Sequence, residues 1–219
     1  MRGLFNQKQQ DERIEELLEK TVKIKTNLFQ ETKDKEQLNP QKRLVSINNV
    51  LNAVKGKLGR PKTAINIGSG FAYETVLLHI KGIKAVGIEK VHLKNIQALT
   101  LFHRLEILLV QTEELDFSKS PAILEADFHK MRFDKQKVDL ITMFYLSKEL
   151  IMNPETLRRC EKLLKKNGKI LLSTEVNSKV ARQILNSKNF PLPKGFSVEI
   201  IKIPRNFEKT VVILKGRSR

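Results

Sequence analysis

The stretch 63–70, which reads Thr-Ala-Ile-Asn-Ile-Gly-Ser-Gly, decides the fold of this chain. Residues 64–67 form a short run typical of a buried strand, and the turn Gly68-Ser69-Gly70 then ends that strand. Ala72, Val76 and Ile80 follow at helical spacing. A strand, a glycine turn and a helix form the first half of a βαβ unit, so this stretch predicts a parallel sheet.

The same alternation continues toward the carboxyl terminus. A helix begins at Leu93, and another begins at the capping residue Asn153, with Pro154 in its first turn, and runs to Gly168. A further helix is predicted near 177–188, and the two last strands form a terminal hairpin. The predicted strands cover 64–67, 84–89, 122–126, 138–144, 169–174, 196–203 and 210–214. The fold class is therefore α/β, with a doubly wound, mostly parallel sheet of seven strands and helices on both faces.

Two helices are predicted before the first strand. Ile14, Leu17, Leu18 and Val22 recur at helical spacing within 11–25, and a second amphipathic pattern runs from Leu44 to Val54. We therefore predict an N-terminal helical extension over 1–60. A single domain over 61–219, ending in the β-hairpin, follows it.

The charge of the chain is unevenly distributed. The 219 residues carry a formal net charge of +17, of which residues 158–219 contribute +12 and residues 61–157 contribute nothing. A neutral centre beside a basic segment predicts a chemical core next to a surface that faces an anionic partner, with nucleic acid as one possibility. Lysine used only to keep the protein soluble is the alternative explanation.

Cysteine and histidine usage predicts a reduced, intracellular protein without a metal. Cys160 is the only cysteine, which excludes an intramolecular disulfide and a cysteine-based zinc cluster, and the four histidines lack a ligand spacing. No apolar run approaches the ~20 residues of a membrane span, and the first residues contain no secretory signal. We expect a cytoplasmic protein that does not bind a membrane.

The glycine turn is the first candidate for a ligand site. Glycines at the carboxyl end of a first strand let a ligand approach the main chain closely. A dinucleotide site would need a third glycine where this chain has Tyr73, because the helix N-terminus must then face a pyrophosphate. S-adenosylmethionine (SAM) has no phosphate, so this pattern favours SAM over NAD or FAD.

Two acidic residues follow the next strands at the same edge of the sheet. Glu89 ends the strand 84–89, where a carboxylate accepts both hydroxyls of an adenosine ribose. Asp127 follows the strand 122–126, where it can accept the exocyclic amine of adenine while the Phe128 ring packs on the adenine plane. Each could instead be structural, as a solvated strand end or a simple turn.

An apolar and aromatic stretch leaves the fourth predicted strand at this edge. Met143, Phe144 and Tyr145 are placed where the methyl donor would point. Such a lining suits a narrow channel that desolvates a lysine amine before it attacks the sulfonium methyl group. Ordinary core packing by Met143 and Phe144 is the alternative.

From Asn66 to about Glu175 the chain resembles a class I SAM-dependent methyltransferase. Within that superfamily it most resembles the non-SET protein-lysine methyltransferases, which include the disruptor-of-telomeric-silencing histone methylases and their small archaeal relatives. The resemblance rests on the glycine turn, Val86–Lys90, Glu125–Phe128, Ile141–Leu146 and Leu163–Ser173. Asn66 stands where the family usually has aspartate, and Thr142-Met143-Phe144 is closer to the archaeal type than to the Asn-Asn-Phe of the eukaryotic enzymes.

The resemblance implies SAM as the cofactor and a protein lysine as the methyl acceptor. Asn66, Gly68 and Gly70 would hold the methionyl end, Glu89 the ribose, and Asp127 with Phe128 the adenine. We also expect Ser69, Lys90 and Met143 in the cofactor site, and Phe144 with Tyr145 lining the acceptor channel. RNA methylation, a small-molecule transferase of the nicotianamine-synthase type and an inactive binding module are the alternatives.

Overall fold

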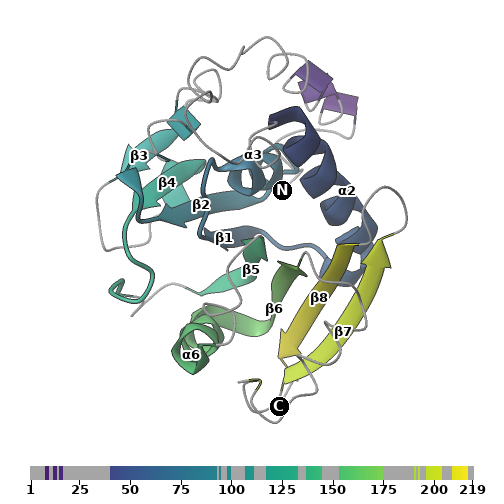
Figure 1. The fold of residues 1–219 in the computed structure, drawn as a ribbon, viewed down its shortest axis with the longest axis vertical. Helices are drawn as coiled ribbons and strands as arrows, with labels where there is room; N and C mark the ends of the chain where they lie inside the picture. Colours follow the sequence, from purple (N-terminus) through teal and green to yellow (C-terminus); the bar gives the residue numbers. More distant parts are fainter. Residues whose placement is uncertain are drawn as a thin grey trace, which may run out of the picture.

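Within the part of the chain that the computed structural model describes, eight strands form one mixed sheet in the order β3-β4-β2-β1-β5-β6-β8-β7 (Figure 1). The described residues are 8–9, 12–13, 15–16, 40–92, 94, 98–99, 107–110, 117–132, 137–144, 153–174, 190, 192, 196–203 and 209–216. The strands are β1 (Thr63–Ile67), β2 (Lys84–Glu89), β3 (Leu108–Val110), β4 (Ala122–Glu125), β5 (Val138–Phe144), β6 (Leu164–Thr174), β7 (Phe196–Ile203) and β8 (Lys209–Gly216).

Strands β1 to β6 pair in parallel, and the terminal hairpin adds β8 and β7 in antiparallel orientation. The predicted mostly parallel α/β sheet and its closing hairpin are therefore confirmed. The sheet has eight strands rather than the predicted seven, because β3 pairs with the outer side of β4. Three residues are too few to show a period of two, so the sequence pattern could not reveal this edge strand.

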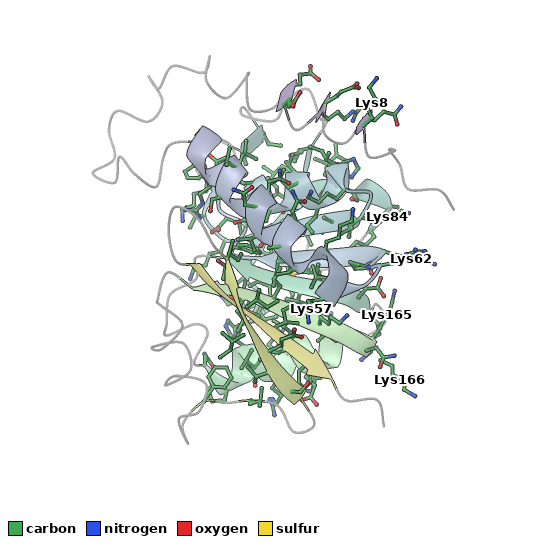
Figure 2. All side chains as sticks on the ribbon, turned by 90° about the vertical axis from the view of Figure 1, so that its right-hand side faces the viewer. Lys8, Lys57, Lys62, Lys84, Lys165 and Lys166 are labelled. Carbon is green, nitrogen blue, oxygen red and sulfur yellow. The ribbon has the colours of Figure 1, made fainter. Side chains whose placement is uncertain are left out.

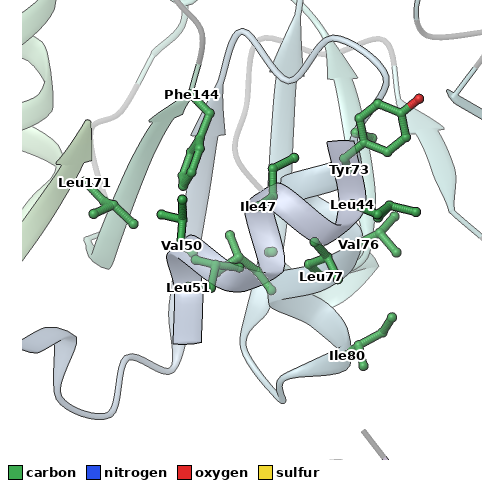
Figure 3. Close-up of a cluster of buried hydrophobic side chains, with 14 of the residues drawn as sticks. Leu44, Ile47, Val50, Leu51, Tyr73, Val76, Leu77, Ile80, Phe144 and Leu171 are labelled. Carbon is green, nitrogen blue, oxygen red and sulfur yellow. The ribbon is translucent and has the colours of Figure 1, made fainter. Parts of the chain in front are cut away.

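Helices cover both faces of the sheet. On one face lie α2 (Pro40–Leu58) and α3 (Tyr73–Ile80), and α6 (Pro154–Leu163) packs on the other. The predicted apolar stripe of α2 is fully buried, and Figure 3 shows Ile47, Val50 and Leu51 of this helix over the sheet beside Leu77 and Phe144. Although α2 falls within the predicted N-terminal extension, it belongs to the same hydrophobic core as the sheet.

The start of α6 is as predicted, whereas its end is not. Asn153 Oδ1 accepts a hydrogen bond from the Glu155 backbone N–H at 2.9 Å, and Pro154 occupies the first turn. The helix ends at Leu163 instead of continuing to Gly168. The chain turns extended at Leu164, and Asn167 adopts a left-handed φ of 68°. A Cβ on Gly168 would lie 2.8 Å from the Leu164 side chain, so this glycine permits a tight entry into β6 rather than capping the helix.

Three predicted helices fall mostly or wholly outside the described residues: 11–25, the helix that begins at Leu93, and 177–188. No helix in the described part of the chain combines the length and the apolar character needed to cross a bilayer.

Candidate functional site

The turn after β1 is tied to β2 through the backbone. The N–H groups of Gly68 and Ser69 both donate to the Ile88 carbonyl, at 2.9 and 3.0 Å. Gly68 and Gly70 have positive φ angles of 65° and 51°, which favour glycine. A Cβ built on Gly70 would meet no atom within 4 Å, so the main chain here faces open space. The turn therefore offers its backbone to a ligand at the carboxyl edge of the sheet.

Glu89 joins this turn to the end of β2. Its side chain is buried, at 7% relative exposure. Oε2 accepts a hydrogen bond from the Gly70 N–H at 2.9 Å, and Oε1 accepts one from the Val91 N–H at 3.0 Å. Because a buried carboxylate is costly unless it is hydrogen-bonded, these two donors explain how Glu89 stays at this position. They also bring the acid against the glycine turn.

Gly87, which the sequence interpretation did not single out, makes the close approach of turn and strand possible. A Cβ at this position would lie 2.7 Å from both Ser69 Cβ and Thr75 Oγ1. Ser69 therefore packs its side chain against β2, and its buried Oγ has no hydrogen-bond partner. The signal was present in the sequence, since a glycine inside a strand often marks a close contact.

Asn66 is the centre of a buried polar network between the sheet and α3. Its Nδ2 donates to Glu74 Oε2 at 3.3 Å and to Thr75 Oγ1 at 3.4 Å, and its Oδ1 accepts from Thr142 Oγ1 at 3.2 Å. The strand register places Asn66 beside Gly87 on one side and Thr142 on the other. Asn66 therefore links α3 to the two central strands.

Asp127 and Phe128 lie in the turn that follows β4. Asp127 is partly exposed, and its Oδ1 accepts a hydrogen bond from the His129 N–H at 2.9 Å. Phe128 is only 5% exposed, and the Arg159 guanidinium lies 5.6 Å from its ring centroid. The position of Asp127 at the same sheet edge as Glu89 follows from the pairing of β2 with β4. The Phe128 ring belongs to the core beneath α6.

The apolar residues at the end of β5 pack within the sheet. Met143 belongs to the core cluster on the α6 side and Phe144 to the cluster on the α2 side, and both are buried. Figure 3 shows the Phe144 ring beside Val50 of α2. Tyr145 lies outside the described residues, and Lys90 is exposed. The acceptor-channel roles of Phe144 and Tyr145, and the place of Met143 and Lys90 in the cofactor site, stay predictions.

The comparison with known proteins decides the family of this sheet and its turn. Residues 65–172 match the family model described as a methyltransferase domain. The chain contains a class I SAM-dependent methyltransferase domain. The matched segment begins two residues before the end of β1 and runs into β6, so it includes every strand end described above. No curated protein sequence matches the chain significantly.

The methyltransferase domain also resembles solved structures. A methyltransferase from Geobacter sulfurreducens superposes with a TM-score of 0.57 at 12% identity, covering 93% of this chain and 89% of that one. The ribosomal protein L11 methylase from Lactobacillus delbrueckii subsp. bulgaricus gives 0.56 at 14% identity, covering 81% and 80%. The plantazolicin methyltransferase BpumL gives 0.55 at 14% identity, covering 94% and 99%. At these identities the likeness shows the shared fold.

The residues of this methyltransferase fit SAM, its cofactor. The space over Gly70 lets a ligand reach the main chain, and the adjacent Glu89 carboxylate has about four acceptor positions in total. Both the Gly70 backbone and the Glu89 carboxylate can therefore bind a ligand that has no phosphate, such as SAM. Tyr73, which occupies the position of the missing third glycine, is 2% exposed and begins α3. Burial raises the pKa of Tyr73, and the partial opposition of Arg43 does not reverse this effect, so the phenol stays neutral.

Proposed function

We propose that this methyltransferase transfers a methyl group from SAM to the side-chain amine of a protein lysine. The observation that carries the cofactor part of the proposal is the hydrogen bond between Gly70 and Glu89, which holds an acid against an open backbone turn. The acceptor part is supported by the apolar end of β5 and by the resemblance to enzymes whose names refer to a ribosomal protein and to plantazolicin.

Each anchor of the proposed cofactor site has a separate role. Gly68 and Gly70 let the methionyl end approach the main chain, Glu89 accepts the ribose hydroxyls, and Asp127 accepts the adenine amine. Asn66 acts as a positioning residue, because its amide holds Glu74 and Thr142 beneath the turn. When bound, SAM supplies an electrophilic methyl group on a sulfonium centre.

The acceptor amine has to arrive neutral. SAM would supply the methyl group as an electrophile and would be left as a neutral thioether, so the amine nitrogen needs a free lone pair. Thr142, Met143 and Phe144 are buried and carry no ionisable group. An apolar lining disfavours the ammonium form, so the lysine releases its proton to water before attack. Alignment then replaces a strong catalytic base.

The experiment that tests the acceptor uses radiolabelled SAM and cell extract. One portion of extract is pretreated with RNase and another with protease, and the purified enzyme is added after each nuclease or protease is inactivated. We expect label to be lost after protease and, in untreated extract, to appear as methyllysine after acid hydrolysis. Label that survives protease but is lost after RNase would replace the lysine acceptor with RNA. Label resistant to both would indicate a small molecule.

A further inference from the structure

Six exposed cations gather at the edge of the sheet opposite the cofactor site. We call this surface the lysine edge, and it consists of Lys57, Lys62, Lys84, Lys137, Lys165 and Lys166. Figure 2 shows five of them, with Lys84, Lys62, Lys165 and Lys166 in succession along one side of the molecule. We propose that the lysine edge is a docking surface for the phosphate backbone of a folded RNA.

The strand topology brings these lysines together from distant parts of the sequence. Lys84, Lys62, Lys137 and Lys165 lie at the amino ends of β2, β1, β5 and β6, which are neighbours in the sheet. With strands about 4.8 Å apart, the four amino ends extend over about 14 Å. A nucleic-acid duplex carries one negative charge per about 1.7 Å of helix axis, so several phosphates fall within the length of this row.

Acidic groups do not neutralise this surface. Asp139, which is half-buried, lies beneath it, and its Oδ1 contacts Lys165 Nζ at 3.1 Å. Glu199 contacts Lys57 Nζ at 2.9 Å. Within the described part of the chain, Asp139 and Glu199 are the carboxylates that form ion pairs with the six cations, which leaves an excess of positive charge. Lys137 Nζ donates to the Lys162 carbonyl, which holds this side chain in place at the surface.

Side-chain chemistry favours phosphate over bases. The large apolar side chains exposed among the described residues are Val45, Val91 and Leu108, none of which is aromatic. Stacking on single-stranded bases requires exposed aromatic rings, whereas contacts to phosphates require cations. The lysine edge therefore suits the backbone of a helical segment and carries no sequence readout.

The position of the edge favours a folded RNA over a DNA duplex. Lys84 and Glu89 are the two ends of β2, and five residue steps separate their Cα atoms by about 17 Å. The edge therefore anchors a partner without touching the reacting atoms. A linear DNA duplex has a persistence length of about 50 nm and therefore continues straight past the edge, whereas a compact folded RNA joins short helices at angles and can carry a bound protein to the far side. This choice of RNA rests on the proposed methylation of a protein; the docking surface itself does not.

Binding without SAM tests the inference separately from the methylation activity. The probe is transfer RNA, and affinity is measured by fluorescence anisotropy over a range of salt concentrations. The test protein carries Lys62→Gln, Lys84→Gln and Lys166→Gln. The control carries Lys94→Gln, Lys130→Gln and Arg132→Gln, which are also exposed but lie outside the edge. Thermal unfolding of both proteins shows that they are folded.

We expect the wild type to bind RNA with a steep salt dependence. The edge variant should lose about two to three from the magnitude of the log–log slope and at least about tenfold in affinity at 0.15 M salt, while the control changes little. A linear DNA duplex of equal phosphate count should compete at least about tenfold less well. Equal losses in both variants, no RNA binding by the wild type, equal competition by poly-glutamate, or equal competition by DNA would each overturn the inference.

Discussion

The Gly70 N–H donates to Glu89 Oε2 across 2.9 Å, and this bond connects the turn after β1 to the end of β2. The two residues are separated by a helix in the sequence, yet they form one unit at the carboxyl edge. The backbone at Gly70 and the carboxylate of Glu89, which we propose to bind the ribose, are therefore held together by this bond. Any change at Glu89 should affect both cofactor affinity and the shape of the turn.

Replacing Glu89 by alanine should weaken SAM binding by about 1.5–3 kcal/mol, which corresponds to roughly 10- to 150-fold in affinity. The reason is the loss of a charged acceptor together with the release of the Gly70 and Val91 N–H groups. Isothermal titration calorimetry measures the affinity. Glu155→Gln is the matched control, because Glu155 pairs with Arg158 on the solvent-facing side of α6. Equal affinity of Glu89→Ala and wild type would remove Glu89 from the site.

Gly87→Ala and Gly56→Ala should change stability in opposite directions. A methyl group at position 87 would lie 2.7 Å from Ser69 and Thr75, and overpacking of this kind costs about 1–3 kcal/mol. A methyl group at position 56 in α2 meets nothing within 4 Å, so the higher helix propensity of alanine should stabilise by about 0.5–1 kcal/mol. Urea unfolding of the two variants measures both changes. A destabilisation of similar size at both positions would contradict the packing described for Gly87.

Asp139 should contribute to stability in a pH-dependent way. Its burial tends to raise its pKa, but hydrogen bonds from Lys62, Lys165 and Thr63 outweigh that effect and hold the pKa of Asp139 below its ordinary value of 3.8. Because the pKa is lower in the folded state, the contribution is complete above the unfolded value and disappears as the pH falls through the folded one. Asp139→Asn should therefore lose about 1–3 kcal/mol at pH 7.

The measurement for Asp139 is the difference in unfolding free energy between wild type and variant from pH 7 to pH 2. The difference should shrink below about pH 4. Glu155→Gln serves as the control, since an exposed pair contributes at most about 1 kcal/mol. A difference that stays constant over the whole pH range would show that Asp139 acts without its charge.

Asn66→Asp should destabilise the protein at neutral pH and less so in acid. The substitution would place a carboxylate about 3.3 Å from Glu74 Oε2, where Asn66 now donates. Two buried carboxylates cannot both ionise, so the folded-state pKa of one must rise. A raised pKa means that the variant is penalised once the pH exceeds about 4, with a loss on the order of 2–4 kcal/mol at pH 7.

Thermal unfolding of Asn66→Asp at pH 4 and pH 7 measures this loss. Thr142→Val is the comparison variant, because it removes one hydrogen bond to Asn66 without adding charge and should cost about 1 kcal/mol at both pH values. A variant Asn66→Asp as stable as wild type at pH 7 would show that Glu74 is not charged beside it.

Local sequence patterns were sufficient to predict the elements that have a clear apolar run, a capping residue or a turn. The apolar runs of β1, β2 and β5, the cap at Asn153 and the terminal hairpin all lie where they were predicted. The sequence did not show that α6 ends at Leu163, because Lys165–Gly168 resemble a helix terminus as closely as a bulged strand entry. The point at which the helix ends depends on the contact between Gly168 and the Leu164 side chain, and a local sequence pattern does not reveal this contact.

For the candidate site, the strand ends were predictable but the direction of each side chain was less so. Glu89 and Asp127 follow from the rule that parallel strands end at one edge. The helix that covers each face of the sheet instead determines the contacts of Asn66, Phe128 and Phe144. The alternation of Asn66 between Ile65 and Ile67 indicated two faces, but the partners Glu74 and Thr142 come from elements that only the tertiary structure brings together.

The six-residue length of β2 has a consequence for how such an enzyme can change its targets. Lys84 and Glu89 belong to one rigid strand but share no neighbour, so substitutions at either end are energetically independent. Recognition of a new partner can then evolve at one end without altering chemistry at the other. β2 therefore separates the proposed docking surface at Lys84 from the proposed cofactor site at Glu89.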